Sequence, residues 1–168
     1  MRKKKREKLA EDTFWANFFY FNIPAHINEV PAHLDRVNFR YYSANDEDLF
    51  RMIEYVKSIY QLDLDETDVT DEGMKHLSQL DNITEIRLKG CREISDLGMA
   101  YICQFKGVEL LHLYGTGVTT AGFGQIGLLT KLKTLIIEAD INDPKLEEIY
   151  TALPPGCELI VSYKAYPF

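Results

Sequence analysis

The sequence predicts an α/β fold: a right-handed solenoid in which short parallel strands alternate with helices and each strand–helix unit stacks on the one before it. Three observations predict it. An apolar triplet recurs five times, at intervals of 24 or 25 residues. A pattern typical of a helix start recurs between the triplets at nearly the same interval. Each predicted helix carries its apolar residues on one face, so that every unit buries its apolar side against its neighbours.

The apolar triplet predicts the strands. Its last two members are two residues apart, which is the period of a β-strand, so both side chains point to the same side of the sheet. Its first member turns inward from the loop that enters the strand. We expect five parallel strands in one curved sheet, at residues 37–39, 62–64, 86–88, 111–113 and 135–137, with the helices on the convex side.

The helix starts are predicted by an apolar residue that precedes Thr, Ser or Asn, whose side chain can accept a hydrogen bond from the first helical turn. Acidic residues follow in three of the four regular copies, where the helix dipole favours them. Pro144 suits the first position of the last helix. A degenerate first unit has the same start. The predicted capping residues are Asn45, Thr70, Ser95, Thr119 and Asn142.

Together, the pattern LxxLxLxx[N/C] and the helix start [I/V]-[T/S]-D-x-G-[L/M] resemble leucine-rich repeats of the cysteine-containing, ribonuclease-inhibitor-like type. Cys91 stands at the position that gives this type its name, and Thr67, Thr116 and Asp140 replace it in other units. The resemblance covers roughly residues 34–153 and implies a horseshoe segment with a concave parallel sheet and convex helices. The layout is also similar to that of coupling factor B of ATP synthase.

The two ends of such a stack need covers. We expect an N-terminal helical aromatic cap at residues 1–33, five repeats at residues 34–153, and a closing strand and tail at residues 154–168, with the strand near residues 159–161. Pro24 would end the N-terminal helix. The alternative is that its rings form a dimerising or partner-binding surface. These rings are Phe14, Trp15, Phe18, Phe19 and Phe21.

The charge of the chain is unevenly distributed. The net charge is −7, but from Leu9 onward the chain carries 13 basic and 25 acidic residues. So acidic a body argues against binding nucleic acid, whose affinity for proteins comes mainly from phosphate neutralisation. We interpret the basic run as a solvated helix end, with an anionic membrane surface or an acidic partner as alternatives. The run consists of Arg2, Lys3, Lys4, Lys5, Arg6 and Lys8.

The N-terminal region shows no secretory signal, because the basic run leads into Glu7, Glu11 and Asp12 rather than an apolar core. The aromatic-rich stretch at residues 14–23 is shorter than the roughly 20 apolar residues of a membrane span. We therefore expect no stable membrane insertion. A cytoplasmic location is predicted, with the mitochondrial matrix as the alternative.

The sequence offers no catalytic constellation, and we expect neither an enzyme nor a cofactor. Cys91, Cys103 and Cys157 form no CxxC pair, so neither a disulfide framework nor a zinc site is indicated. The acidic cluster at residues 63–66 could attract a divalent cation, but it lacks the EF-hand spacing. We therefore predict no metal site. A metal-dependent enzyme at this cluster remains an alternative.

Strand residues between the inward positions are expected on the concave side of the sheet, where repeat proteins present their binding surfaces. Residues at equivalent positions of neighbouring strands form rows across that side. The first row is Arg36, Gln61, Glu85, Leu110 and Thr134; the middle row is Asn38, Asp63, Arg87, His112 and Ile136; the outer row is Arg40, Asp65, Lys89, Tyr114 and Glu138.

Charges of opposite sign alternate across the first three strands. We expect Arg40, Asp65 and Lys89 to neutralise one another, and Asp63 to pair with Arg87. The charge of Asp65 would then be neutralised within the sheet, so we expect Asp65 to contribute little to binding.

The fourth and fifth strands lack this compensation and are expected to expose an apolar and aromatic patch, as protein interfaces do. Tyr114 is the anchor that we expect to matter most. The alternative is that residues 163–168 fold over the patch. The candidate partner-binding residues are Leu110, His112, Tyr114, Ile136, Glu138, Arg87 and Lys89.

These features predict a non-catalytic protein-binding scaffold or adaptor subunit whose partner is another protein. One alternative is a structural homo-oligomer, such as a homodimer, joined through the N-terminal aromatic segment. The other is the metal-dependent enzyme at the acidic cluster.

Overall fold

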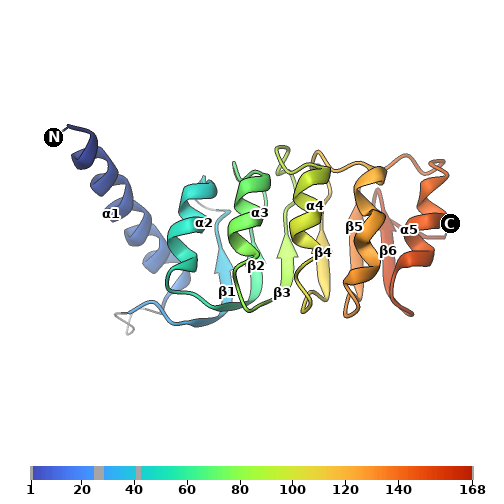
Figure 1. The fold of residues 1–168 in the computed structure, drawn as a ribbon, viewed down its shortest axis with the longest axis horizontal. Coiled ribbons are helices and arrows are strands. Elements are labelled where there is room, and N and C mark those ends of the chain that lie inside the picture. Colours follow the sequence, from blue (N-terminus) through green and yellow to red (C-terminus); the bar gives the residue numbers. More distant parts are fainter. Residues whose placement is uncertain (1, 25–28, 41–42, 168) are drawn as a thin grey trace.

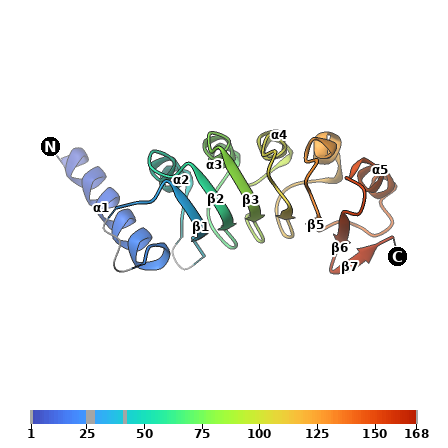
Figure 2. The ribbon, with the colours of Figure 1, turned by 90° about the horizontal axis from the view of Figure 1, so that it is seen from below.

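The computed structural model describes residues 2–24, 29–40 and 43–167, and within them it is an α/β structure with a seven-stranded sheet. Helices lie along one side of the sheet (Figures 1 and 2). The strands are β1 His33–Asn38, β2 Ser58–Asp63, β3 Asn82–Arg87, β4 Leu110–His112, β5 Thr134–Ile137, β6 Glu158–Val161 and β7 Lys164–Tyr166. The helices are α1 Arg2–Asn22, α2 Asp46–Ile53, α3 Asp71–Leu77, α4 Asp96–Ile102, the 3₁₀ helix η1 Thr120–Leu128 and α5 Lys145–Ala152.

The sheet confirms the five predicted strands. They lie side by side in the order of the chain and are all parallel, and the predicted sixth strand, β6, continues the series. The first three begin earlier than predicted, because the first triplet member already pairs within the strand: Leu34 lies beside Ile59, and Ile59 beside Ile83. The strand β7 was not predicted, and it pairs antiparallel with β6.

The core runs through the stack as columns of apolar side chains. The second triplet member of each unit lies directly beside its counterpart on the next strand, and each of these side chains is fully buried. Stacking of this kind buries the apolar side of every unit against its neighbours. The column consists of Val37, Leu62, Ile86, Leu111, Leu135 and Leu159.

The predicted caps are found in the first four units. Asn45, for example, accepts hydrogen bonds from the backbone N–H groups of Glu47 and Asp48 and forms a capping box with the Asp48 carboxylate. Thr70, Ser95 and Thr119 each cap the helix that follows them by accepting one backbone N–H, without a capping box.

The predicted cap at Asn142 is wrong. The helix α5 begins later, and the Asp143 carboxylate accepts from the Lys145 N–H at 2.9 Å. Asn142 instead hydrogen-bonds to the Asp140 carboxylate through both its backbone and its side chain. Pro144 has helical backbone angles and no N–H that would need a partner, so the helix begins around it and Asp143, rather than Asn142, takes the capping position.

An aspartate at the start of each of the helices α2, α3 and α4 joins its unit to the next one. One carboxylate oxygen of Asp46 accepts the Thr70 N–H at 2.8 Å, and the other accepts the Thr70 hydroxyl at 2.7 Å. A capping residue is therefore held by the preceding unit while it caps its own helix. The same pair of bonds runs from Ser95 to Asp71 (2.8 and 2.6 Å) and from Thr119 to Asp96 (2.7 and 2.8 Å).

This arrangement explains the glycine of the helix-start motif. A Cβ atom at Gly73 or Gly122 would lie 2.5 Å from the Oδ1 atom of the linking aspartate in the preceding unit, and at Gly98 it would lie closer still. Real Cβ atoms do not approach an oxygen so closely. The glycine is required because the carboxylate occupies the space of a side chain.

The helical segment of the fourth repeat unit differs from the others. The sequence predicts a regular helix here, but residues Thr120–Leu128 form a 3₁₀ helix. Three glycines, Gly122, Gly124 and Gly127, lie within this segment, and each weakens the preference for an α-helix by roughly 1 kcal/mol. Phe123 and Ile126 are nevertheless buried, so the segment still covers the sheet.

The helix α1 lies beside the first unit and slants away from it toward the N-terminus (Figures 1 and 2). Phe14 and Phe18 are buried, with ring centroids 6.5 and 6.1 Å from that of Phe39. The other aromatic residues of α1 are less covered, and Tyr20 is 82% exposed. Part of the aromatic segment therefore covers the end of the stack, and part faces solvent.

Parts of two expected segments lie outside the described residues. These parts include residues 25–28 of the N-terminal cap and Phe168 of the closing segment. In the parts of the chain that are described, no helix is both long and apolar enough to cross a bilayer.

We predict that Leu111→Ala lowers the free energy of unfolding by roughly 2–5 kcal/mol, as expected for emptying a packed leucine site. Chemical denaturation measures this loss. Leu97→Ala is the matched control, because Leu97 is 73% exposed and should cost far less. A loss below about 1 kcal/mol for Leu111→Ala would contradict its place in the core.

Candidate functional site

The candidate site lies on the side of the sheet opposite the helices, which we call the helix-free face (Figure 2). The strand register brings together the predicted first and middle rows. The next strand extends the middle row, because Ile160 lies beside Ile136. Ile160 was not predicted as a member of the face, although it lies within the predicted sixth strand.

The charges on the first strands pair only partly as predicted, because the Arg40–Asp65 ion pair is confirmed and the other pairings differ. The Arg40 guanidinium contacts both Asp65 and Asp63, the latter at 3.6 Å. The other Asp65 oxygen accepts the backbone N–H of Lys89 at 2.8 Å, and Asp63 accepts the Asp65 N–H at 3.1 Å. Both carboxylates are buried. Arg40 thus neutralises the pair from one side while backbone N–H groups fill their remaining oxygens.

The expected ion pair between Asp63 and Arg87 is therefore wrong, and Lys89 holds Asp65 with its backbone rather than its ammonium group. Asp65 is only 2% exposed. Its hydrogen bonds give it a structural role that the sequence alone did not indicate.

His112 is buried, contrary to the expectation that it is exposed. It lies in the middle row between Arg87 and Ile136, and only 8% of it is exposed. Neither ring nitrogen has a hydrogen-bond partner among the described residues. Burial lowers the pKa of His112; nearby Asp65 raises it, and three cations lower it further. The neutral imidazole is therefore favoured. These cations are Arg87, Lys89 and Arg40.

Tyr114 is half-buried, because the turn between β6 and β7 places Tyr163 against it. The two ring centroids are 4.4 Å apart. Burial raises the pKa of the Tyr114 hydroxyl, and Glu138 and Tyr163 raise it further. The expectation of a freely exposed Tyr114 is thus wrong. The closing segment covers this residue, whereas Leu110 and Ile136 stay partly exposed.

A hollow of about 540 Å³ adjoins the face where β3 and β4 end. Its side chains include Lys89, Arg92, Tyr114 and Glu138. The turn residues Gly90 and Gly115 also line it, with φ angles of 77° and 74° that favour glycine. The hollow therefore borders the face with mixed charges and aromatic surface.

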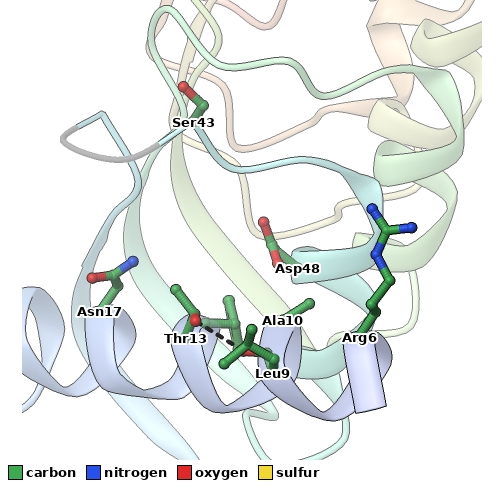
Figure 3. A pocket seen from close by; sticks show the side chains of 8 residues that line it. Arg6, Leu9, Ala10, Thr13, Asn17, Ser43 and Asp48 are labelled. Atoms are coloured by element: carbon green, nitrogen blue, oxygen red, sulfur yellow. Dashed lines mark hydrogen bonds between the residues drawn. The ribbon is translucent and has the colours of Figure 1, made fainter. Parts of the chain in front are cut away.

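A second hollow, of about 500 Å³, lies between α1 and α2 (Figure 3). Two of its polar side chains are engaged: the Thr13 hydroxyl donates to the Leu9 carbonyl at 2.8 Å, and Arg51 donates to the Asp48 carboxylate at 3.0 Å. Burial raises the pKa of Asp48.

The cysteines serve the packing of the stack. All three are buried. The Cys91 thiol donates to the Leu64 carbonyl at 3.0 Å, and the Thr67 hydroxyl donates to the same carbonyl at 2.7 Å. Burial raises the pKa of Cys103 and of Cys157 to about 11, which keeps these thiols protonated and poorly nucleophilic.

No protein-family model matches the chain, and no curated protein matches it. Across the described ranges, no three His, Cys, Asp or Glu side chains gather in a group that could hold a metal ion.

We predict that His112 makes stability depend on pH in the weakly acidic range. Its pKa in the folded protein lies below the value of about 6.5 in the unfolded chain, so the unfolded state binds more protons between the two. Stability should be fully present above about pH 6.5 and fall as the pH drops toward the folded pKa. Denaturation of wild type and His112→Leu at several pH values measures this.

The variant His112→Leu should lose this part of the pH dependence. His33→Gln is the control and should retain it, because His33 is exposed and hydrogen-bonded to Ser58. Equal pH profiles for wild type and His112→Leu would refute the buried, unpartnered state of His112.

Proposed function

We propose that the chain is a leucine-rich-repeat solenoid that acts as a non-catalytic binding scaffold or adaptor subunit for another protein. Support for the family comes from the turn that follows each strand. The Thr67 and Thr116 hydroxyls and the Cys91 thiol, at equivalent positions, all donate to strand-end carbonyls, as the resemblance implies. The parallel strands in chain order support a solenoid.

The observation that carries the binding proposal is the contrast between the two halves of the helix-free face. On β1 and β2, Asp63 and Asp65 are buried and neutralised by Arg40. On β4 to β6, the half-buried Leu110, Ile136 and Ile160 form a partly exposed apolar strip. Apolar surface bordered by charge is typical of protein interfaces.

Three features favour binding over catalysis. The carboxylates of the acidic cluster are engaged by Arg40 and by backbone N–H groups, which leaves them poorly placed to hold a metal ion. His112, the buried histidine, has no described partner that would orient it as a base. The thiols are protonated and buried. Three unpaired thiols also fit a reducing compartment such as the cytoplasm.

A homo-oligomer is the second candidate, favoured by aromatic surface at the other end of the molecule. Tyr20 is largely exposed, and a hollow of about 410 Å³ beside α1 is lined by Trp15, Phe19, Val30 and Tyr55, together with Glu29. A second copy could bury this surface. The two candidates therefore use different residues and can be separated by mutation.

We predict that Ile136→Glu removes the partner, because it places a charge in the apolar strip, while folding persists. Affinity capture from the native host, followed by mass spectrometry, measures partner binding. Light scattering of the pure protein measures its oligomeric state. Tyr20→Glu is the matched control and should capture the same partner as wild type.

The opposite pattern would refute the scaffold. A partner lost in Tyr20→Glu and kept in Ile136→Glu would move the interface to α1. A wild-type dimer that becomes monomeric only in Tyr20→Glu would establish the homo-oligomer instead.

A further inference from the structure

Cations on β3 and in the turn after it are left without carboxylate partners. Arg51, Lys75 and Lys133 each contact a carboxylate within 3.0 Å, whereas some exposed cations, such as Lys131 and Lys145, form no ion pair within the described residues. Within the described residues, neither Arg87 nor Lys89 forms an ion pair, and neither does Arg92. Three unneutralised cations therefore follow one another along a single segment.

Two nearby acids are already neutralised, because Asp63 and Asp65 are held by Arg40 and by backbone N–H groups. The Glu85 carboxylate accepts from the neutral Gln61 amide at 2.7 Å. Glu66 and Glu138 line the same hollow as Lys89 and Arg92. None of these acids forms an ion pair with Arg87, Lys89 or Arg92 within the described residues.

The charges that act on the His112 imidazole come from one acid, Asp65, and three cations. One of these cations, Arg40, is paired with Asp63 and Asp65. Arg87 and Lys89 are therefore the cations near His112 that form no ion pair within the described residues.

Apolar surface lies directly beside these cations. The register places Arg87 next to His112 and His112 next to Ile136. Leu110 precedes them in the first row, and the tilted ring pair of Tyr114 and Tyr163 lies beyond them. A ligand that spans the face would meet positive charge on β3 and apolar surface on β4 to β6.

We infer that the helix-free face binds a peptide segment of the partner that carries acidic residues next to an apolar or aromatic residue. This inference rests on the proposed scaffold function and specifies the chemistry of its partner. The carboxylates pair with Arg87 and Lys89, where guanidinium and ammonium donors form charge-assisted hydrogen bonds. The apolar side chain lies on Leu110 and Ile136.

A peptide fits this surface better than a nucleic acid does. Nucleic-acid binders neutralise many phosphates at once. Here the positive segment is short, and from Leu9 onward the chain has an excess of acidic residues that would repel a polyanion. A short acidic segment with an apolar side chain meets both halves of the face.

The probe is a displayed library of random peptides about ten residues long, selected on immobilised wild-type protein. The enriched peptides should combine Asp or Glu with Phe, Trp, Leu or Ile. Their binding should weaken about tenfold or more in Arg87→Glu/Lys89→Glu, which should instead select peptides rich in Lys and Arg. Lys131→Glu/Lys145→Glu changes the net charge equally elsewhere and should bind as wild type does. Circular dichroism confirms that each variant is folded.

Each outcome decides between the proposals. Enriched peptides that lose binding in Ile136→Glu but carry no acidic excess would overturn this inference and leave the scaffold function standing. Enrichment no greater than on the bare matrix, or peptides that bind Ile136→Glu unchanged, would overturn both. Competition by an oligothymidine as strong as by the selected peptide would assign the face to nucleic acid and refute the inference.

Discussion

The structure depends on one repeated contact, in which an aspartate at the start of α2, α3 or α4 accepts both the N–H and the hydroxyl of the next unit's capping residue. Asp46, Asp71 and Asp96 make it in turn. The two donors replace water at a half-buried carboxylate. Because the same residue also caps its own helix, each unit fixes both the position and the starting point of the helix that follows.

The helix-free face shows the same regularity. Helices held in register keep the strands in register, and the strands in turn place one residue from each unit in every row across the sheet. A row thus brings together residues 24 or 25 positions apart, such as Arg87, His112 and Ile136. The face changes along the stack from neutralised carboxylates to cations without ion pairs and then to apolar side chains, and this gradient would give the peptide segment that we propose its direction.

Periodic features were predictable from the sequence, and features that break the period were not. The strands, their order and four of five caps follow from repeated residues such as Thr70 and Ser95. The pairing of Arg40 with Asp65 was predicted, but the choice of Arg40 rather than Arg87 as the partner of Asp63 depends on side-chain reach, which the sequence does not contain. The cover over Tyr114 comes from Tyr163 in an unrepeated hairpin, and the burial of His112 follows from packing on both sides.

The most direct test of this account is a double-mutant cycle between Asp71 and Gly98. Gly98→Ala should cost roughly 1–3 kcal/mol of unfolding free energy, because its Cβ would meet the Asp71 carboxylate. In an Asp71→Ala background the same substitution should cost much less, with a coupling of about 0.5–3 kcal/mol. Gly124→Ala, where a Cβ meets nothing within 4 Å, controls for the intrinsic effect of alanine. If Gly98→Ala costs the same in both backgrounds, the aspartate does not set the spacing of the units.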